Sequence, residues 1–157
     1  MAKRFWLFKS EPDVFSWDDL VAAKDRTTCW EGVRNYQARN MMRDEMKVGD
    51  GVLFYHSNAK PQVVMGTAKI VREAYPDSAQ FDPKSKYHDP AATPEEPRWL
   101  MVDIQADRAF ERPLSLPELK QMPALDGMML LKKGARLSVQ PVDKAHWDLI
   151  TKLGFKG

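Results

Sequence analysis

The chain has 157 residues, of which 43% are hydrophobic, a length and composition typical of one globular domain with its own core. Its 24 basic and 22 acidic residues leave a formal net charge of +2, which excludes a polyanion binder that relies on overall charge. The single cysteine excludes an internal disulfide framework, the N-terminus lacks signal-peptide features, and no apolar stretch approaches the roughly 20 residues of a membrane span.

Apolar periodicity predicts five elements in the first half of the chain. In chain order they are a strand, two short helices and the two strands of a hairpin: residues 4–8, 16–24, 35–47, 52–55 and 63–71. Ser16 and Asp19 have the spacing of a capping box at the start of the first helix. Gly66, inside the last of these strands, predicts a bulge or a close approach of the backbone to another group.

A stretch rich in proline and aromatic residues follows, from 75 to 97. It holds five prolines together with Tyr75, Phe81 and Tyr87, whereas a disordered linker would carry fewer aromatic residues. We expect a long, ordered loop whose aromatic side chains either wall a groove or are pinned to the core.

The last third of the chain predicts five more elements. They are a long strand, a short helix, a further helical turn, a short strand and a final helix: residues 99–110, 114–119, 128–133, 136–140 and 143–153. Ser115 and Glu118 again have capping-box spacing. We expect Gly134 and Gly154 to end the helical segments before them, and Pro141 to stop the last strand.

Five or six short strands with helices inserted between them, and no regular alternation of the two, favour an α+β fold over a doubly wound sheet. We expect a small, partly open β-barrel wrapped by short helices, forming a single domain over residues 1–157. The cysteine usage and the absence of a leader predict a cytoplasmic protein with no membrane partner, and we expect a monomer.

Two of the predicted strands end in polar clusters, at residues 9–11 and 56–58, and the run 29–37 lies between them in the chain. A buried strand that stops in hydrogen-bonding residues delivers them to the mouth of a sheet or barrel. Within the run, Trp30 offers a stacking face beside Arg, Asn and Tyr side chains that can bond to a polar edge. This combination suits a flat, polar-edged ligand such as a nucleobase.

Three segments resemble signature segments of the EVE domain family: WLFKSEP at 6–12, WEGVRNYQARN at 30–40 and FYHSN at 54–58. The resemblance continues through residues 72–77, 81–83, 97–99 and 136–141 and so covers nearly the whole chain. It implies a PUA-like pseudo-barrel, related to the YTH domains that hold a methylated adenine in an aromatic cage. It also implies a nucleic-acid partner carrying a modified base, with modified cytosine in DNA as the leading ligand and a modified base in RNA as the other.

By position along that fold, the resemblance places six residues in a base pocket: Ser10, Trp30, Asn35, Tyr36, Ser57 and Asn58. Trp30 is the one that matches a cage aromatic of the YTH domains. The second aromatic is left open among four residues: Tyr36, Phe54, Tyr75 and Trp99.

Several of these candidates also have a structural interpretation. Trp30 could be a core residue, and Asn35 could cap the second helix instead of reading a base edge. The polar cluster at 56–58 could be turn chemistry alone.

Basic and neighbouring side chains form a second group of candidates, for phosphate contacts or for the pocket rim. The principal members are Lys9, Arg34, His56 and Arg39, with Arg43, Lys47 and Lys60 as less favoured ones. For Arg43 and Lys47 a solvated helix face is the preferred interpretation.

The favoured function is a non-catalytic module that accepts a modified base and grips the flanking backbone. The alternatives are a binder of free modified nucleosides and a hydrolase, because PUA-like families include such enzymes. A hydrolase would use Cys29 with His56 and Glu31, although a lone cysteine is more often a small buried hydrophobe. The three histidines lack ligand spacing, so we expect no metal site, and we expect no cofactor.

Overall fold

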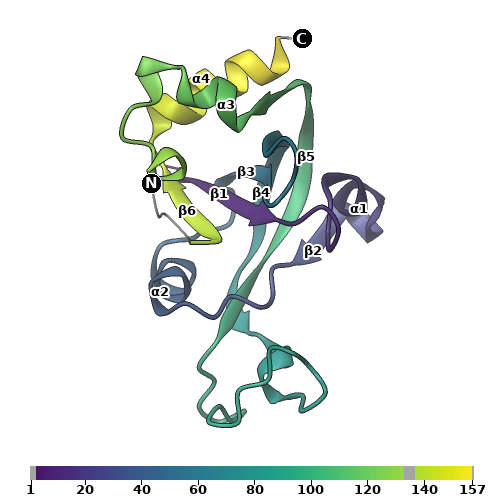
Figure 1. Ribbon diagram of the computed structural model, residues 1–157. Coiled ribbons are helices and arrows are strands. Elements are labelled where there is room, and N and C mark those ends of the chain that lie inside the picture. Colours follow the sequence, from purple (N-terminus) through teal and green to yellow (C-terminus); the bar gives the residue numbers. More distant parts are fainter. Residues whose placement is uncertain (1–2, 133–136, 157) are drawn as a thin grey trace.

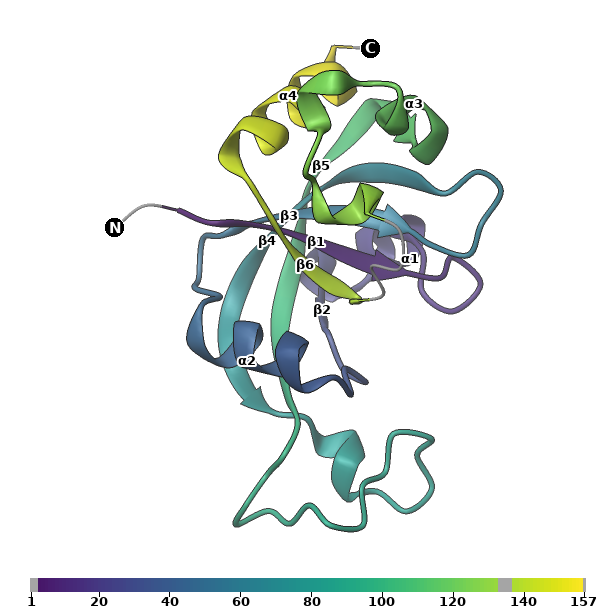
Figure 2. The ribbon, with the colours of Figure 1, turned by 60° about the vertical axis from the view of Figure 1, so that its left-hand side comes forward.

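The computed structural model describes residues 3–132 and 137–156, and in these ranges a six-stranded sheet forms the centre of the molecule (Figures 1 and 2). The strand order is β2-β5-β4-β3-β1-β6. The strands are β1 Phe5–Ser10, β2 Thr27–Cys29, β3 Gly51–His56, β4 Val63–Pro76, β5 Leu100–Ser115 and β6 Val139–Val142. β1 and β3 run parallel and the other pairs antiparallel. The predicted α+β fold with a partly open array of five or six strands is confirmed.

Four α-helices surround this sheet in the described part of the chain: α1 Trp17–Ala22, α2 Tyr36–Asp44, α3 Leu116–Lys120 and α4 Lys144–Phe155. Helices α3 and α4 lie together at one end of the sheet, and α2 lies toward the other end, near the long loop between β4 and β5 (Figures 1 and 2). Short 3-10 turns occur at Lys24–Arg26, Ser78–Phe81, Pro123–Leu125 and Met129–Leu131. In residues 3–132 and 137–156, every helix is too short or too polar to cross a bilayer.

Strand β1 is buried on both faces of the sheet. Trp6 and Phe8 pack into one apolar cluster, whereas Leu7 packs into a second cluster that includes Tyr55 and Ile150. Side chains alternate across a strand, so a strand with cores on both sides must be apolar at successive positions. This is why its sequence has an unbroken apolar run rather than an alternating pattern.

Both predicted capping boxes are confirmed. The Ser16 hydroxyl accepts from the Asp19 N–H at 3.1 Å, and the Asp19 carboxylate accepts from the Ser16 N–H at 2.8 Å. Ser115 and Glu118 make the same reciprocal pair at the start of α3, at 3.4 and 3.3 Å. These bonds depend on residues three apart, so the sequence alone specifies them.

The feature predicted at Gly66 is also confirmed. The register of β4 against β5 shifts between Val64 and Gly66. A Cβ atom on Gly66 would lie 2.7 Å from the Arg108 carbonyl oxygen, so the backbones approach too closely for any side chain.

Two predictions about the C-terminal part are wrong. Pro141 lies inside β6, opposite Trp6, because β6 is an edge strand and the N–H that proline lacks is not needed there. Gly154 lies inside α4 instead of ending it, and a Cβ atom there would come within 2.5 Å of the Phe110 ring. Close packing, rather than helix termination, explains this glycine.

Other boundaries moved by a few residues. Helix α2 ends at Asp44 rather than at 47, and β4 extends to Pro76, so the long loop runs from 77 to 99. The helical turn predicted over 128–133 is a single 3-10 turn, Met129–Leu131. The predicted stop at Gly134 and the start of the strand predicted over 136–140 lie outside the described residues; the described strand begins at Val139.

Candidate functional site

A cavity of about 580 Å³ opens where β1 ends. Its volume lies within the range of small-molecule sites, roughly 300–1,000 Å³. The walls come from the end of β1 and the loop after it, from the end of β2 and the segment that follows it, from the long loop, and from the residue just before β6. The lining residues are 9–11, 14–15, 28–33, 86–87 and 138. Segments far apart in the sequence therefore converge on one hollow, which we call the base cavity.

Trp30 is a core residue that also lines the cavity. Its side chain is 8% exposed and packs against Phe8 and Phe54, with ring centroids 5.1 and 5.7 Å apart. Its backbone N–H donates to the Val102 carbonyl at 2.8 Å, which ties it to the sheet. Trp30 also lines the base cavity, so it forms a rigid aromatic part of the wall that belongs to the core.

Charged and polar groups line the same cavity. Lys9 and Lys86 bring ammonium groups, and Glu11 and Glu31 bring carboxylates. Burial lowers the pKa of Lys9. The Ser10 hydroxyl donates to the Phe15 carbonyl oxygen, which holds the loop of residues 11–15 against the end of β1. The cavity thus presents donors and acceptors beside aromatic walls.

Tyr87 reaches the cavity from the long loop because Gly32 has no side chain. Gly32 adopts φ +84°, and a Cβ atom there would lie 2.6 Å from the Tyr87 ring. The Gly32 N–H donates to the buried Asp77 carboxylate at 2.8 Å. Both the backbone conformation and the close approach require glycine at this position.

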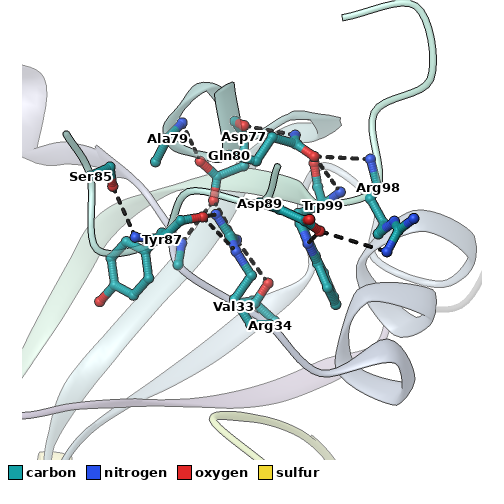
Figure 3. Close-up of polar contacts among 11 residues, drawn as sticks. Val33, Arg34, Asp77, Ala79, Gln80, Ser85, Tyr87, Asp89, Arg98 and Trp99 are labelled. Atoms are coloured by element: carbon teal, nitrogen blue, oxygen red, sulfur yellow. Dashed lines mark hydrogen bonds and ion pairs between the residues drawn. The ribbon is translucent and has the colours of Figure 1, made fainter. Parts of the chain in front are cut away.

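Arg34 joins the cavity segment to the long loop (Figure 3). Its guanidinium donates to the Asp77 carboxylate at 3.0 Å and to the Tyr87 carbonyl at 2.8 and 3.2 Å. A further bond reaches the Val33 carbonyl at 3.0 Å. Asp77 is fully buried, and protein acceptors occupy most of the donors of Arg34. The structure places Arg34 as a positioning residue for the loop, which leaves little of it for a phosphate.

The long loop is ordered by a buried glutamine (Figure 3). The Gln80 amide donates to the carbonyl groups of Asp77 and Trp99, both at 2.7 Å. Its oxygen accepts from the backbone N–H groups of Arg98 and Trp99, both at 2.9 Å. These four bonds connect the two ends of the loop. Of the aromatic residues predicted for this stretch, Tyr87 lines the cavity, whereas Tyr75 belongs to β4 and packs against the core.

Asn35 and Tyr36 do not line the base cavity. The Asn35 side-chain oxygen accepts from the Ala38 N–H at 3.0 Å, so Asn35 is the N-cap of α2. Tyr36 is 51% exposed and packs against Trp99 in a tilted arrangement, with ring centroids 4.9 Å apart. Arg39 lies over the Tyr36 ring at 4.8 Å. These side chains form a separate aromatic group on the side of α2.

The polar cluster that ends β3 is bonded to α1 and to the segment that lines the cavity. His56 accepts from the Trp17 N–H through Nε2 at 3.0 Å, which satisfies a free donor in the first turn of α1. The Ser57 N–H donates to the Ser10 carbonyl at 3.0 Å, and the exposed Asn58 amide lies 3.5 Å from the Glu11 carboxylate. Parallel pairing of β1 with β3 brings these residues beside the cavity loop without placing them in the cavity.

The role of His56 predicts a pH-dependent stability. Burial lowers the pKa of His56 from its ordinary value of 6.5, against an opposing effect of the Asp18 carboxylate. The unfolded chain therefore binds a proton at His56 more readily than the folded chain does. The contribution of His56 to the free energy of unfolding is fully present above pH 6.5 and is lost as the pH falls toward the lower pKa of the folded state. We expect denaturant unfolding between pH 7.5 and 5 to show a steeper loss for the wild type than for His56→Gln, which accepts from Trp17 without titrating. Parallel profiles would contradict this.

The remaining basic candidates are mostly engaged with protein groups. Arg39 donates to the Arg98 carbonyl at 3.0 Å, and Arg43 pairs with its neighbour Asp44 at 2.8 Å. Lys47 lies 3.8 Å from Glu73, and Lys60 is exposed in the turn after β3.

The sequence prediction gave no role to Lys86, Val14 or Phe15. The aromatic residues of the two loops were the available signal, but their convergence depends on the tertiary fold.

The groups proposed for a hydrolase are not arranged as a nucleophile set. Cys29 is exposed rather than buried, and desolvation of the sulfur together with the carboxylates of Glu31 and Asp103 raises the pKa of its thiol. The Nε2 atom of His56 is bonded to the backbone of α1. Among residues 3–132 and 137–156, no group of three metal-ligating side chains is placed to hold an ion.

The chain is similar to known proteins over nearly its whole length. A family model described as EVE domain matches residues 4–153. The chain is 42% identical to thymocyte nuclear protein 1 of Homo sapiens, over 94% of this chain and 72% of that protein. The structure of human THYN1 protein in complex with 5-methylcytosine-containing DNA superposes with a TM-score of 0.92 at 41% identity, covering 99% of both chains. A crystal structure from Pseudomonas putida gives a TM-score of 0.89 at 45% identity, covering 95% of this chain and 98% of that one.

Proposed function

The chain belongs to the EVE domain family, and from this premise we propose that it binds DNA by taking a modified cytosine, with 5-methylcytosine as the first candidate, into the base cavity beside Trp30. The fold is the PUA-like one that the solved relatives share. The observation that carries the proposal is a cavity of base-binding size in which an aromatic wall and a set of charged edge groups meet.

The chemistry of the cavity suits a cytosine edge. Cytosine offers an amino group that donates, and a ring nitrogen and a carbonyl oxygen that accept. The carboxylates of Glu11 and Glu31 complement the amino group, and the ammonium group of Lys9 complements the acceptors. Trp30, Phe15 and Tyr87 supply the aromatic surface against which an extruded base stacks.

The methyl group gives the expected degree of discrimination. Burying one methyl group is worth about 0.8 kcal/mol, which corresponds to roughly a fourfold preference over unmodified cytosine. The base itself contributes about 1–3 kcal/mol through stacking on an aromatic side chain. Binding therefore rests mainly on the base, and the modification adds selectivity.

We propose binding without catalysis, because the raised pKa of Cys29 and the engaged His56 give a hydrolase no activated nucleophile. The location in the cytoplasm, the monomeric state and the single domain stay predictions. RNA and free nucleosides are tested as alternative ligands below.

The Trp30→Phe variant is expected to weaken binding of an oligonucleotide carrying 5-methylcytosine by roughly five- to tenfold, because phenylalanine keeps the core contacts and loses part of the stacking surface. The measurement is a fluorescence anisotropy titration at two salt concentrations. The matched control is Trp147→Phe, a half-buried tryptophan of α4 that packs on Phe5, away from the base cavity. Equal effects of the two substitutions would contradict the assignment.

The same titration separates the ligands. Labelled DNA and RNA of one sequence, carrying cytosine, 5-methylcytosine, 5-hydroxymethylcytosine, adenine or N6-methyladenine, identify the base and the sugar. Affinity that falls with salt indicates contacts to the phosphate backbone. Binding of the free nucleoside with an affinity equal to that of the oligonucleotide would replace the proposed function by nucleoside binding, and no binding to any of them would overturn it.

A further inference from the structure

An exposed apolar side chain stands at the base cavity. Val14 is 64% exposed although it lines the cavity. The other large hydrophobic side chains described as exposed, Val21, Tyr36 and Val48, do not line it. A single exposed valine needs no explanation by itself. Val14 does call for an explanation, because it lies at the cavity and its loop is held in place by hydrogen bonds.

The loop that carries Val14 is held at both ends. The N–H groups of Val14 and Phe15 both donate to the Glu11 carbonyl, each at 2.9 Å. Phe15 packs against the core, and its carbonyl accepts from the Ser10 hydroxyl. The tight turn therefore presents the valine to solvent and keeps it from folding back onto the protein.

The cavity also contains a cation that comes from another part of the chain. Lys86 is exposed, belongs to the long loop tied down by Arg34 and Gln80, and lies 5.1 Å from the centre of the Tyr87 ring. The base cavity is thus bordered by an apolar side chain from one loop and a basic one from another. A DNA strand presents a partner for each of these side chains, because its stacked bases can contact the apolar one and its anionic phosphates can pair with the basic one.

Removing a base from a duplex leaves a gap in the stack. Proteins that distort DNA in this way insert apolar side chains between base steps, and the inserted group replaces part of the lost stacking. We propose that Val14 inserts into the space vacated by the modified base, so that the protein takes its ligand from double-stranded DNA. This inference rests on the proposed function. It adds that the DNA is bound as a duplex and that Val14 is the residue that enters the base stack.

The test compares Val14→Ala with Val48→Ala, a matched loss from a valine that is 58% exposed and does not line the cavity. Each protein is titrated with a 5-methylcytosine oligonucleotide as a duplex and as a single strand. In the duplex, the fluorescent base analogue 2-aminopurine is placed next to the modified base. The fluorescence of 2-aminopurine rises when it is no longer stacked on its neighbour. Both substitutions are at exposed positions, so folding is preserved.

We expect Val14→Ala to bind the duplex roughly tenfold more weakly, because two methyl groups no longer fill the gap, and therefore to give a smaller 2-aminopurine signal at the protein concentration that half-saturates the wild type. Single-strand binding by Val14→Ala should weaken by a clearly smaller factor than duplex binding, because the valine lines the base cavity but has no gap to fill in a single strand, whereas all binding by Val48→Ala should change by less than about twofold. Equal weakening of duplex and single strand, or no weakening of either, would overturn the inference. Wild-type binding to the single strand alone would overturn it and leave the proposed function standing, whereas no binding to either form would overturn both.

Discussion

Replacing Asp77 by alanine is expected to lower the free energy of unfolding by about 3 kcal/mol and to remove most of the affinity for the modified base. Asp77 is 0% exposed and accepts from the N–H groups of Gly32 and Ala79 and from the Arg34 guanidinium. Breaking a buried ion pair costs about 3–5 kcal/mol. The Arg34 side chain keeps 21% exposure and its bonds to Tyr87, which places the expected cost at the lower end.

The measurement is chemical denaturation of Asp77→Ala beside Glu95→Ala, which removes an exposed carboxylate from the same loop. The double variant Asp77→Ala with Arg34→Met should recover part of the lost stability, because replacing both partners leaves no uncompensated charge. A loss below about 1 kcal/mol for Asp77→Ala, the upper range of a surface pair, would show that this ion pair does not hold the loop.

The second large effect is expected at Gly32, where alanine should weaken binding of 5-methylcytosine DNA more than tenfold, on the scale of a lost stacking contact. A Cβ atom would lie 2.6 Å from the Tyr87 ring, so the ring must move, and it lines the base cavity. The φ of +84° adds backbone strain of about 1–2 kcal/mol for any residue with a side chain.

Gly49→Ala separates these two effects. Gly49 has φ +96°, and a Cβ atom there meets no atom within 4 Å, so the substitution introduces the strain without displacing a neighbour. We expect a similar loss of stability in thermal unfolding and unchanged binding in the anisotropy titration. If Gly32→Ala and Gly49→Ala reduce binding equally, Tyr87 does not shape the site.

The candidate site was predicted in part. The resemblance and the local pattern pointed to the segment around Trp30 and to Ser10, and both line the base cavity. Asn35 and His56 were interpreted as possible binding groups, yet Asn35 is the N-cap of α2 and His56 accepts from an N–H in the first turn of α1. A polar residue at an element boundary satisfies either interpretation, because the same donor or acceptor serves a backbone group or a ligand.

Local chemistry determined the features that depend on residues close in sequence. The capping boxes, the buried strand 5–8 and the α+β class follow from spacings of a few residues, and the sequence by itself determined them. The role of Gly154 could not be predicted in this way. Whether a glycine ends a helix or makes room for an aromatic ring depends on a partner far away in the chain.

Only the tertiary structure decided which side chains meet in the base cavity. Tyr87 and Lys86 reach it because Arg34 pairs with Asp77, 43 positions later, and Val14 stands there because its loop is bonded to the end of β1. Such contacts bring together segments that no local pattern relates, and their stability comes from burial and charge pairing across the fold. The sequence thus determined the elements and one aromatic wall of the site, and the packing of the long loop determined the rest.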